Sequence, residues 1–356
     1  MKTDFSKLVR PHLWNLTPYS SARDEYKGTE GVFLDANENP FGSVTGELVN
    51  RYPDPHQTEI KRKLSQIKGV RKEQIFLGNG SDEAIDLLIK AICSPLEQSI
   101  LILPPTYGMY KVCADIQQVT VLSAPLTVDF DIDLPRVEET IEPSTQMIWI
   151  CSPNNPSGNL VDREKIRTIV EKYPQKIVVI DEAYIDFAPD ASWLPVLDQY
   201  PNVVILQTFS KAWGMAGLRL GMAFAHPELI AILNKIKYPY NLNILTQKAL
   251  LNALDHEDQK NQMVQDLIQE RQILAEALQN QAEVLHIFPS DSNQLLVRVK
   301  NPSALFHYLI GQKVITRDRS NVLLCEGCLR ISIGTREENA HLLVEMNRFS
   351  EQNSAM

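Results

Sequence analysis

The chain lacks most features of a secreted or membrane-spanning protein. Its five cysteines are an odd number scattered over 356 residues, so they do not form a disulfide framework. No apolar run approaches the ~18 residues that a membrane-spanning helix needs. The first 16 residues carry charges throughout and have no apolar segment of the kind found in a secretion signal. We therefore expect a soluble cytoplasmic protein with reduced thiols and no membrane partner.

Positive charge and metal-binding patterns are also scarce. The chain has 35 Lys and Arg residues against 44 Asp and Glu, which gives a net charge of −9 and a pI near 5.4. Because binding a nucleic-acid backbone needs clustered lysines and arginines, this balance argues against such a partner. Cys325 and Cys328 make one C-x-x-C, but no second pair or nearby histidine completes a zinc site. We expect no metal.

The pattern along the chain predicts three parts. Residues 1–30 have weak periodicity and are predicted to be an arm that packs on another part of the assembly. In residues 31–255, short apolar runs alternate with helical patterns such as 82–92, which is typical of β-α-β units and an α/β fold. Residues 256–356 are predicted to form a smaller α+β domain. Its expected elements are a long amphipathic helix around 263–278, strands at 294–299 and 328–333, and a helix at about 337–349.

Three polar motifs follow three apolar, β-branched runs. The runs at 147–150, 177–180 and 203–206 are predicted to be strands buried on both faces of a parallel sheet. In open α/β sheets, ligands bind outside the carboxyl ends of the strands. We therefore expect the motifs to meet at one site: CSPNNPSG from Cys151 to Gly158, DEAY from Asp181 to Tyr184, and TFSKAWGMAGLRLG from Thr208 to Gly221.

Lys211 and Asp181 have the chemistry that a pyridoxal-phosphate enzyme needs. Such an enzyme uses a lysine to bind the cofactor covalently and an acid to keep the pyridine nitrogen protonated. An opposite charge within ~4–6 Å typically shifts a pKa by 1–3 units, which is enough to hold a pyridinium near neutral pH. Taken alone, Lys211 is also explained as an exposed loop lysine and Asp181 as a helix N-cap. Their joint occurrence at strand ends favours the cofactor site.

Three other side chains can contact the same cofactor. Asn155 and Tyr184 are placed to bond its phenolic oxygen, although a type I turn and a helix-facing tyrosine also explain them. Tyr107 in PPTYGMY can lay its ring on the pyridine, and core packing is the alternative.

A phosphate site is predicted where GNGSDE follows the strand at 74–77 and opens a helix. The backbone amides near Gly80, Ser81 and Asp82 can bind an anion at that helix N-terminus, and Ser210 and Arg219 can complete the site. A dinucleotide site is rejected because Glu83 stands where the third glycine would be, and the chain has no P-loop motif.

These motifs together resemble the histidinol-phosphate aminotransferases, a family of class II pyridoxal-phosphate-dependent enzymes with the aspartate aminotransferase fold. Matches extend along nearly the whole chain. The SKA and NNP patterns are shared by many aminotransferases of this fold, whereas TPY in the arm, RYPDP, ITRD and LRISIGT are more particular to this family. The resemblance implies a large, mostly parallel sheet domain with helices on both faces and a smaller α+β domain.

The resemblance also implies an activity and residue roles. The reaction converts L-histidinol phosphate and 2-oxoglutarate to imidazole-acetol phosphate and L-glutamate, in histidine biosynthesis. Lys211 would be the Schiff-base lysine, and Arg330, with Arg317 and Tyr19 beside it, would hold the substrate phosphate or the glutamate carboxylate. Tyr52, a loop tyrosine, would reach the cofactor phosphate from the other subunit of a homodimer. Asn155 would also face the substrate.

Two alternatives remain open. Within the same fold, the chain can be an aromatic amino-acid aminotransferase or a related phosphate-amine lyase. A non-catalytic pyridoxal-binding regulator is a more distant alternative, because the chain has neither an appended helix-turn-helix segment nor a basic face for DNA.

Overall fold

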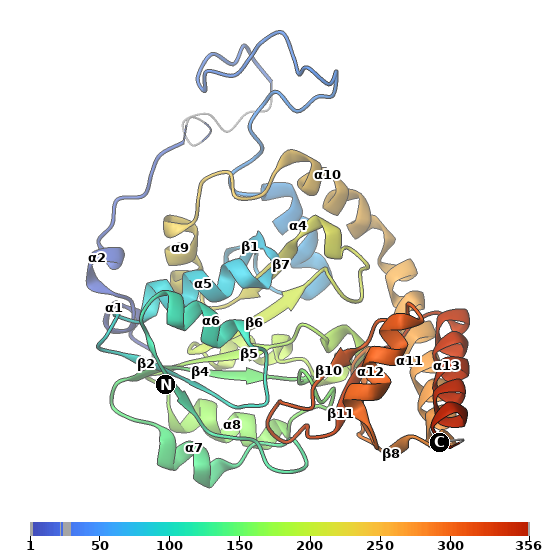
Figure 1. Cartoon of the computed structure of the whole chain (residues 1–356). Coiled ribbons are helices and arrows are strands. Elements are labelled where there is room, and N and C mark those ends of the chain that lie inside the picture. The colour runs from blue at the N-terminus through green and yellow to red at the C-terminus, as the bar shows by residue number, and fades with distance from the viewer. Residues whose placement is uncertain (1–2, 22, 24–29, 355–356) are drawn as a thin grey trace.

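The computed structural model of the chain describes residues 3–21, 23 and 30–354. A seven-stranded sheet forms its centre and a four-stranded sheet lies to one side (Figure 1). In spatial order, the strands of the large sheet are β1 (Ile75–Asn79), β7 (Leu220–Phe224), β6 (Val203–Thr208), β5 (Ile177–Asp181), β4 (Thr145–Cys151), β2 (Ser99–Ile102) and β3 (Thr120–Ser123). Strands β3, β2, β4, β5 and β6 are parallel, whereas β7 runs antiparallel to its neighbours β6 and β1.

The apolar runs form strands because alternate side chains enter two different cores. In β5, Ile177 and Val179 pack against helices on one face of the sheet, and Val178 and Ile180 pack against helices on the other. Fully burying such a side chain contributes roughly 1.5–3 kcal/mol. The first face carries α5 (Gly80–Ile92), α6 (Met109–Ile116) and α9 (Pro227–Ile236); the second carries α4 (Thr58–Lys68), α7 (Leu134–Thr140), α8 (Arg163–Lys172) and α10 (Ile244–Ala253).

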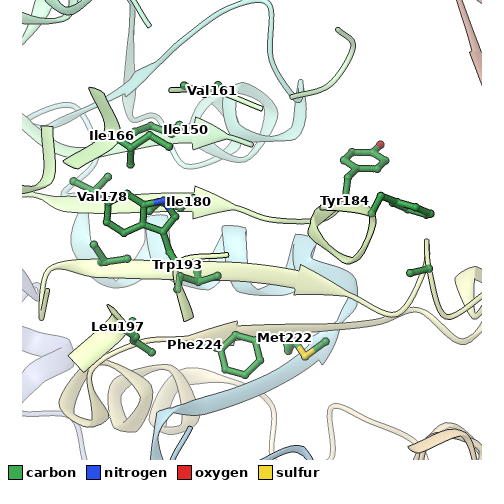
Figure 2. Close-up of a cluster of buried hydrophobic side chains, with 14 of the residues drawn as sticks. Ile150, Val161, Ile166, Val178, Ile180, Tyr184, Trp193, Leu197, Met222 and Phe224 are labelled. Carbon is green, nitrogen blue, oxygen red and sulfur yellow. The ribbon is translucent and has the colours of Figure 1, made fainter. Parts of the chain in front are cut away.

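Figure 2 shows part of the second core. Val178 and Ile180 of β5 lie beside Trp193, and Met222 lies further along the same core beside Phe224 of β7. Tyr184 lies beyond the end of β5, with its hydroxyl turned away from the apolar side chains. The strands are thus fixed by packing along their length, while the residues that follow them are available for chemistry.

The small sheet is antiparallel throughout and has a core of its own. Leu274, Leu278, Val297, Leu309 and Met346 are buried together there. The predicted strands at 294–299 and 328–333 are confirmed, and so are the two predicted helices around 263–278 and 337–349. The helix between the two strands, Pro302–Gly311, was not predicted. In spatial order, the elements are β10 (Arg317–Asp318), β11 (Cys328–Ser332), β9 (Gln294–Val299) and β8 (Val284–Ile287), covered by α11 (Glu257–Gln279), α12 (Pro302–Gly311) and α13 (Arg336–Ser354).

Two further observations concern the cysteines and the length of the apolar helices. All five cysteines are buried and free. Within the described ranges, no helix combines the length and the apolar character needed to cross a membrane.

The first part of the predicted arm packs on the large domain. Its helices α1 (Phe5–Leu8) and α2 (Pro11–Trp14) lie against α5 and α9 of the large sheet. The physical reason is that Phe5 and Leu8 are apolar enough to join that core, where both are buried. Residues 1–2, 22 and 24–29 of the predicted arm lie outside the described residues.

Residues 30–52 extend away from the rest of the chain at the top of Figure 1. Several of their large apolar side chains are almost fully exposed, among them Val32, Leu34 and Phe41 at 88%, 86% and 97%. In this segment, the carboxylate of Glu38 accepts hydrogen bonds from the guanidinium of Arg51 and the backbone N–H of Tyr52, and it also accepts one from Arg23, which precedes the segment. The segment therefore has internal polar order but leaves its apolar side chains uncovered.

Candidate active site

A cavity of about 570 Å³ opens at the carboxyl ends of the large sheet's parallel strands, where β10 and β11 of the small sheet face them. The three predicted polar motifs all contribute to its wall, and so does the start of α5. The predicted site residues that line it are Ser81, Asp82, Tyr107, Asn155, Asp181, Tyr184, Ser210, Lys211, Arg219, Arg317 and Arg330. Residues that are remote in sequence thus meet at one place.

Lys211 follows β6 and lies in the open part of the cavity. Its Nζ is 5.5 Å from the centroid of the Tyr184 ring. Partial removal from water, together with the positive charges of Arg330 and Arg219, lowers the pKa of Lys211 below its ordinary value. A lysine in this environment gives up its proton more readily than a surface lysine, as a nucleophilic amine must.

Asp181 is the last residue of β5 and is buried beneath the cavity. Burial raises its pKa to about 6, and this effect is opposed by a hydrogen bond that the Tyr110 hydroxyl donates to Oδ2 over 2.5 Å. The backbone N–H of Ala183 donates to Oδ1. Tyr110 is itself held by stacking on Trp149, with the ring centroids 4.8 Å apart. The carboxyl group is therefore fixed in place and poised to carry charge when a cation faces it.

The turn from β1 into α5 forms one end of the cavity. Arg219 stands directly before β7 with a left-handed backbone (φ 53°), and its carbonyl accepts from the N–H of Gly80 over 2.8 Å. Its guanidinium contacts Ser210 Oγ at 3.5 Å and Asp82 Oδ2 at 3.3 Å. The Asp82 carboxylate also accepts a hydrogen bond from the Tyr107 hydroxyl. Asp82 can therefore meet an anion only through its backbone N–H, at the positive end of α5.

Two glycines leave room for this arrangement. A Cβ at Gly80 would lie 2.7 Å from the guanidinium of Arg219, and one at Gly221 would lie 2.0 Å from the backbone nitrogen of Ser81. Larger residues at either position would close the space between α5 and β7. The donors around this space are a helix N-terminus, a hydroxyl and a guanidinium, which is the donor set that a phosphate group requires.

The opposite wall of the cavity is cationic. Arg330 of β11 donates from Nη1 to Asn155 Oδ1 over 2.7 Å. Because a guanidinium can only donate, this contact orients the Asn155 amide and leaves its NH₂ group as a donor toward the cavity. Arg317 is paired with Arg330 across the β10–β11 ladder. The cavity thus has an anion site at each end.

Two predicted site residues are not brought to the cavity within one chain. Tyr52 is half exposed and stacks on Tyr240, with the centroids 4.4 Å apart, in a separate hollow beside residues 36–53. Tyr19 is 76% exposed and does not line the cavity. The expectation that Tyr52 acts from another subunit is consistent with this position and stays a prediction.

Sequence reasoning missed two residues of the site. Tyr110 belongs to the PPTYGMY motif, and only the orientation of α6 brings its hydroxyl to Asp181. Arg319 lines the cavity two positions after Arg317. Its nearness in sequence to Arg317 was the available signal, since Arg319 directly follows the two-residue strand β10.

The chain is similar to known proteins over nearly its whole length. The chain matches the family model described as aminotransferase class I and II over residues 29–345. It is 54% identical over 343 residues to the histidinol-phosphate aminotransferase of Cytophaga hutchinsonii, covering 96% of this chain and 98% of that protein. The corresponding protein of Parabacteroides distasonis is 50% identical over the same shares of the two chains.

The fold is also that of solved structures. The histidinol-phosphate aminotransferase of Sinorhizobium meliloti, solved in complex with pyridoxal-5'-phosphate, superposes with a TM-score of 0.77 at 22% identity. The superposition covers 89% of this chain and 90% of that one. This likeness shows the shared fold, and the match of the family model and the curated relatives show that the chain belongs to the aminotransferase class I and II family.

Proposed function

We propose that the chain is a pyridoxal-phosphate-dependent aminotransferase that converts L-histidinol phosphate and 2-oxoglutarate to imidazole-acetol phosphate and L-glutamate. The observation that carries this proposal is the joint placement of Lys211, Asp181 and two anion sites in one cavity. The near full-length identity to curated histidinol-phosphate aminotransferases favours this substrate over an aromatic amino acid. The same residues argue against a regulator without catalysis, since such a protein needs no second anion site.

The residues present fit the cofactor. The backbone of Ser81 and Asp82, the Ser210 hydroxyl and the Arg219 guanidinium would hold its phosphate, in the space that Gly80 and Gly221 keep open. Asp181 would accept a hydrogen bond from the pyridine nitrogen. The Asn155 amide and the Tyr184 hydroxyl would donate to the phenolic oxygen, and the Tyr107 ring would cover one face.

Different side chains of the cavity transfer the proton, hold negative charge and bind the substrate anion. Pyridoxal phosphate, when bound, supplies an electron sink for the carbon next to the substrate nitrogen. Lys211 is the group that moves a proton to and from that carbon, because its lowered pKa makes the neutral amine accessible. Asp181 holds negative charge at the buried end of the cavity. Arg330 and Arg317 bind the anionic end of each substrate in turn, and their guanidinium forks suit phosphate and carboxylate alike.

The test is a transamination assay of the purified protein with histidinol phosphate, phenylalanine, tyrosine and aspartate, each with 2-oxoglutarate. We expect histidinol phosphate to be the best amino donor. Borohydride reduction of the holoenzyme should leave the cofactor attached to Lys211, and Lys211→Ala should abolish this labelling. A preference for phenylalanine, or release of carbon dioxide in place of transamination, would favour the alternatives within the fold.

We further propose a cytoplasmic homodimer with shared active sites. The uncovered apolar side chains of residues 30–52 support it, since contiguous exposed apolar surface marks interaction sites. The position of Tyr52 outside its own chain's cavity supports the sharing. Free, buried cysteines suit a reducing compartment. We also propose that the chain consists of an N-terminal arm of residues 1–30, a large cofactor-binding domain of residues 31–255 and a small domain of residues 256–356.

A further inference from the structure

We infer that Arg319 is a specificity-determining residue that completes, with Arg317 and Arg330, a three-guanidinium site for a phosphate dianion. The inference rests on the proposed function and deepens it. It concerns selection between substrates: Arg319 makes the cavity favour an amine that carries a phosphate over one that carries only carboxylates.

The three arginines share one wall of the cavity. All three line it, and Arg317 and Arg330 are partners across the β10–β11 ladder. Arg319 and Arg317 both lower the pKa of Arg330, after the larger effect of its burial, so both positive charges act on Arg330. Arg319 also lowers the pKa of Tyr184, against the larger effect of burial, which places its charge near the reactive end of the cavity.

Among the described residues, no carboxylate forms an ion pair with the guanidinium group of Arg317, Arg319 or Arg330. The Nε of Arg330 is buried, and no described residue accepts a hydrogen bond from it. Three positive charges gathered on one wall repel one another, and an external anion bound among them relieves this repulsion.

The backbone of Arg319 is fixed but its side chain is loosely held. Its N–H donates to the carbonyl of Cys328 over 2.9 Å, and its own carbonyl accepts from Val322 over 2.8 Å. The guanidinium makes one long contact, 3.5 Å, to the carbonyl of Asp318. The Asp318 carboxylate accepts instead from the N–H of Ser320. A structural arginine would use more of its five donors within the protein.

Charge and geometry decide which anion gains most from a third arginine. A phosphate monoester carries nearly two negative charges at neutral pH and presents three terminal oxygens. A carboxylate carries one charge and two oxygens, which two guanidinium forks already satisfy. Arg319 should therefore contribute strongly to binding a phosphate and weakly to binding a carboxylate.

The experiment compares Arg319→Gln and Arg319→Lys with the wild type as holoenzymes. The matched control is Lys300→Gln, which removes one positive charge from an exposed position outside the cavity. Single-turnover measurements give kcat/KM separately for histidinol phosphate and for glutamate. Inorganic phosphate is then used as an inhibitor of the glutamate half-reaction, which probes the anion site without the imidazole.

For Arg319→Gln we expect kcat/KM for histidinol phosphate to fall roughly 10- to 100-fold, mainly through KM, with less than about a threefold change for glutamate. The inhibition constant of phosphate should rise by a similar factor. Arg319→Lys should retain part of the selectivity, and Lys300→Gln all of it. Equal losses with both substrates, no loss with either, or an effect of the control as large as that of Arg319→Gln would overturn the inference.

The two proposals fail in different ways. If the wild-type enzyme does not transaminate histidinol phosphate, the proposed function is wrong. Phosphate inhibition of glutamate turnover still tests Arg319 in that case. If the wild type uses histidinol phosphate and phosphate inhibition is unchanged in Arg319→Gln, only the role of Arg319 is wrong.

Discussion

Two opposing influences set the pKa of Asp181 in the cavity. Burial raises its pKa to about 6, and the hydrogen bond from Tyr110 is the largest influence that opposes burial. Such a bond to a charged group is worth roughly 1.5–3 kcal/mol, or about one to two pKa units. Tyr110 thus acts on the reaction through the ionisation of Asp181.

Tyr110→Phe should raise the pKa of Asp181 further. A higher pKa means that the carboxyl group becomes neutral at a higher pH, so activity should be lost earlier as the pH falls. We expect the acidic limb of the kcat/KM profile to move upward by roughly one to two pH units. Tyr200→Phe is the control, because Tyr200 donates to exposed Glu171 far from the cavity. Superimposable profiles for the two variants would disprove the role of Tyr110.

Arg330 should serve both substrates. It lies beside Asn155, and its buried Nε has no hydrogen-bond partner among the described residues, so phosphate and carboxylate can bind the same fork in turn. For Arg330→Ala, we expect both single-turnover half-reactions to lose roughly 2–5 kcal/mol of transition-state binding, about 30- to several-thousand-fold in kcat/KM. Loss with only one substrate would mean that different residues hold the two anions.

At the scale of elements, the contact between α5 and β7 sets the shape of the phosphate end. Gly221→Ala would place a methyl group 2.0 Å from the backbone of Ser81, where no flexible side chain can yield. We expect the variant to unfold at lower urea concentration, with a loss of roughly 1–3 kcal/mol or more, and to bind the cofactor more weakly. Gly217→Ala, which meets no atom within 4 Å, should behave as wild type. Equal stability of the two variants would refute the packing argument.

Some elements could be predicted from the sequence because their pattern is local. The runs that became β4, β5 and β6 are continuous and apolar, and Asp181 and Lys211 were found because they follow such runs. β8 and β10 could not be predicted, since β8 is half exposed and β10 has two residues, so both exist through pairing with β9 and β11. The reversed direction of β7 likewise depends on its neighbours.

At the scale of the whole molecule, the proposed homodimer predicts that Tyr52 of one chain and Lys211 of the other belong to one site. Mixing inactive Tyr52→Ala and Lys211→Ala proteins under subunit exchange should restore activity, since each hybrid dimer contains one site with both residues intact. Because one of its two sites is intact, each hybrid dimer is expected to approach half the activity of a wild-type dimer. Mixing two Lys211→Ala preparations serves as the control. Proven exchange without recovery would show that each chain completes its own site.

The pairing of β1 with β7 has a consequence for how the chain folds. Arg219 and Asp82 are 137 positions apart in the sequence, yet they meet at the phosphate end of the cavity. Contacts of such long range form late, because closing a long loop costs entropy before the contact repays it. During synthesis, α5 leaves the ribosome well before β7. The chain should therefore bind the cofactor only near the end of folding. The rate at which a refolding chain binds the cofactor then measures the rate at which β7 pairs with β1.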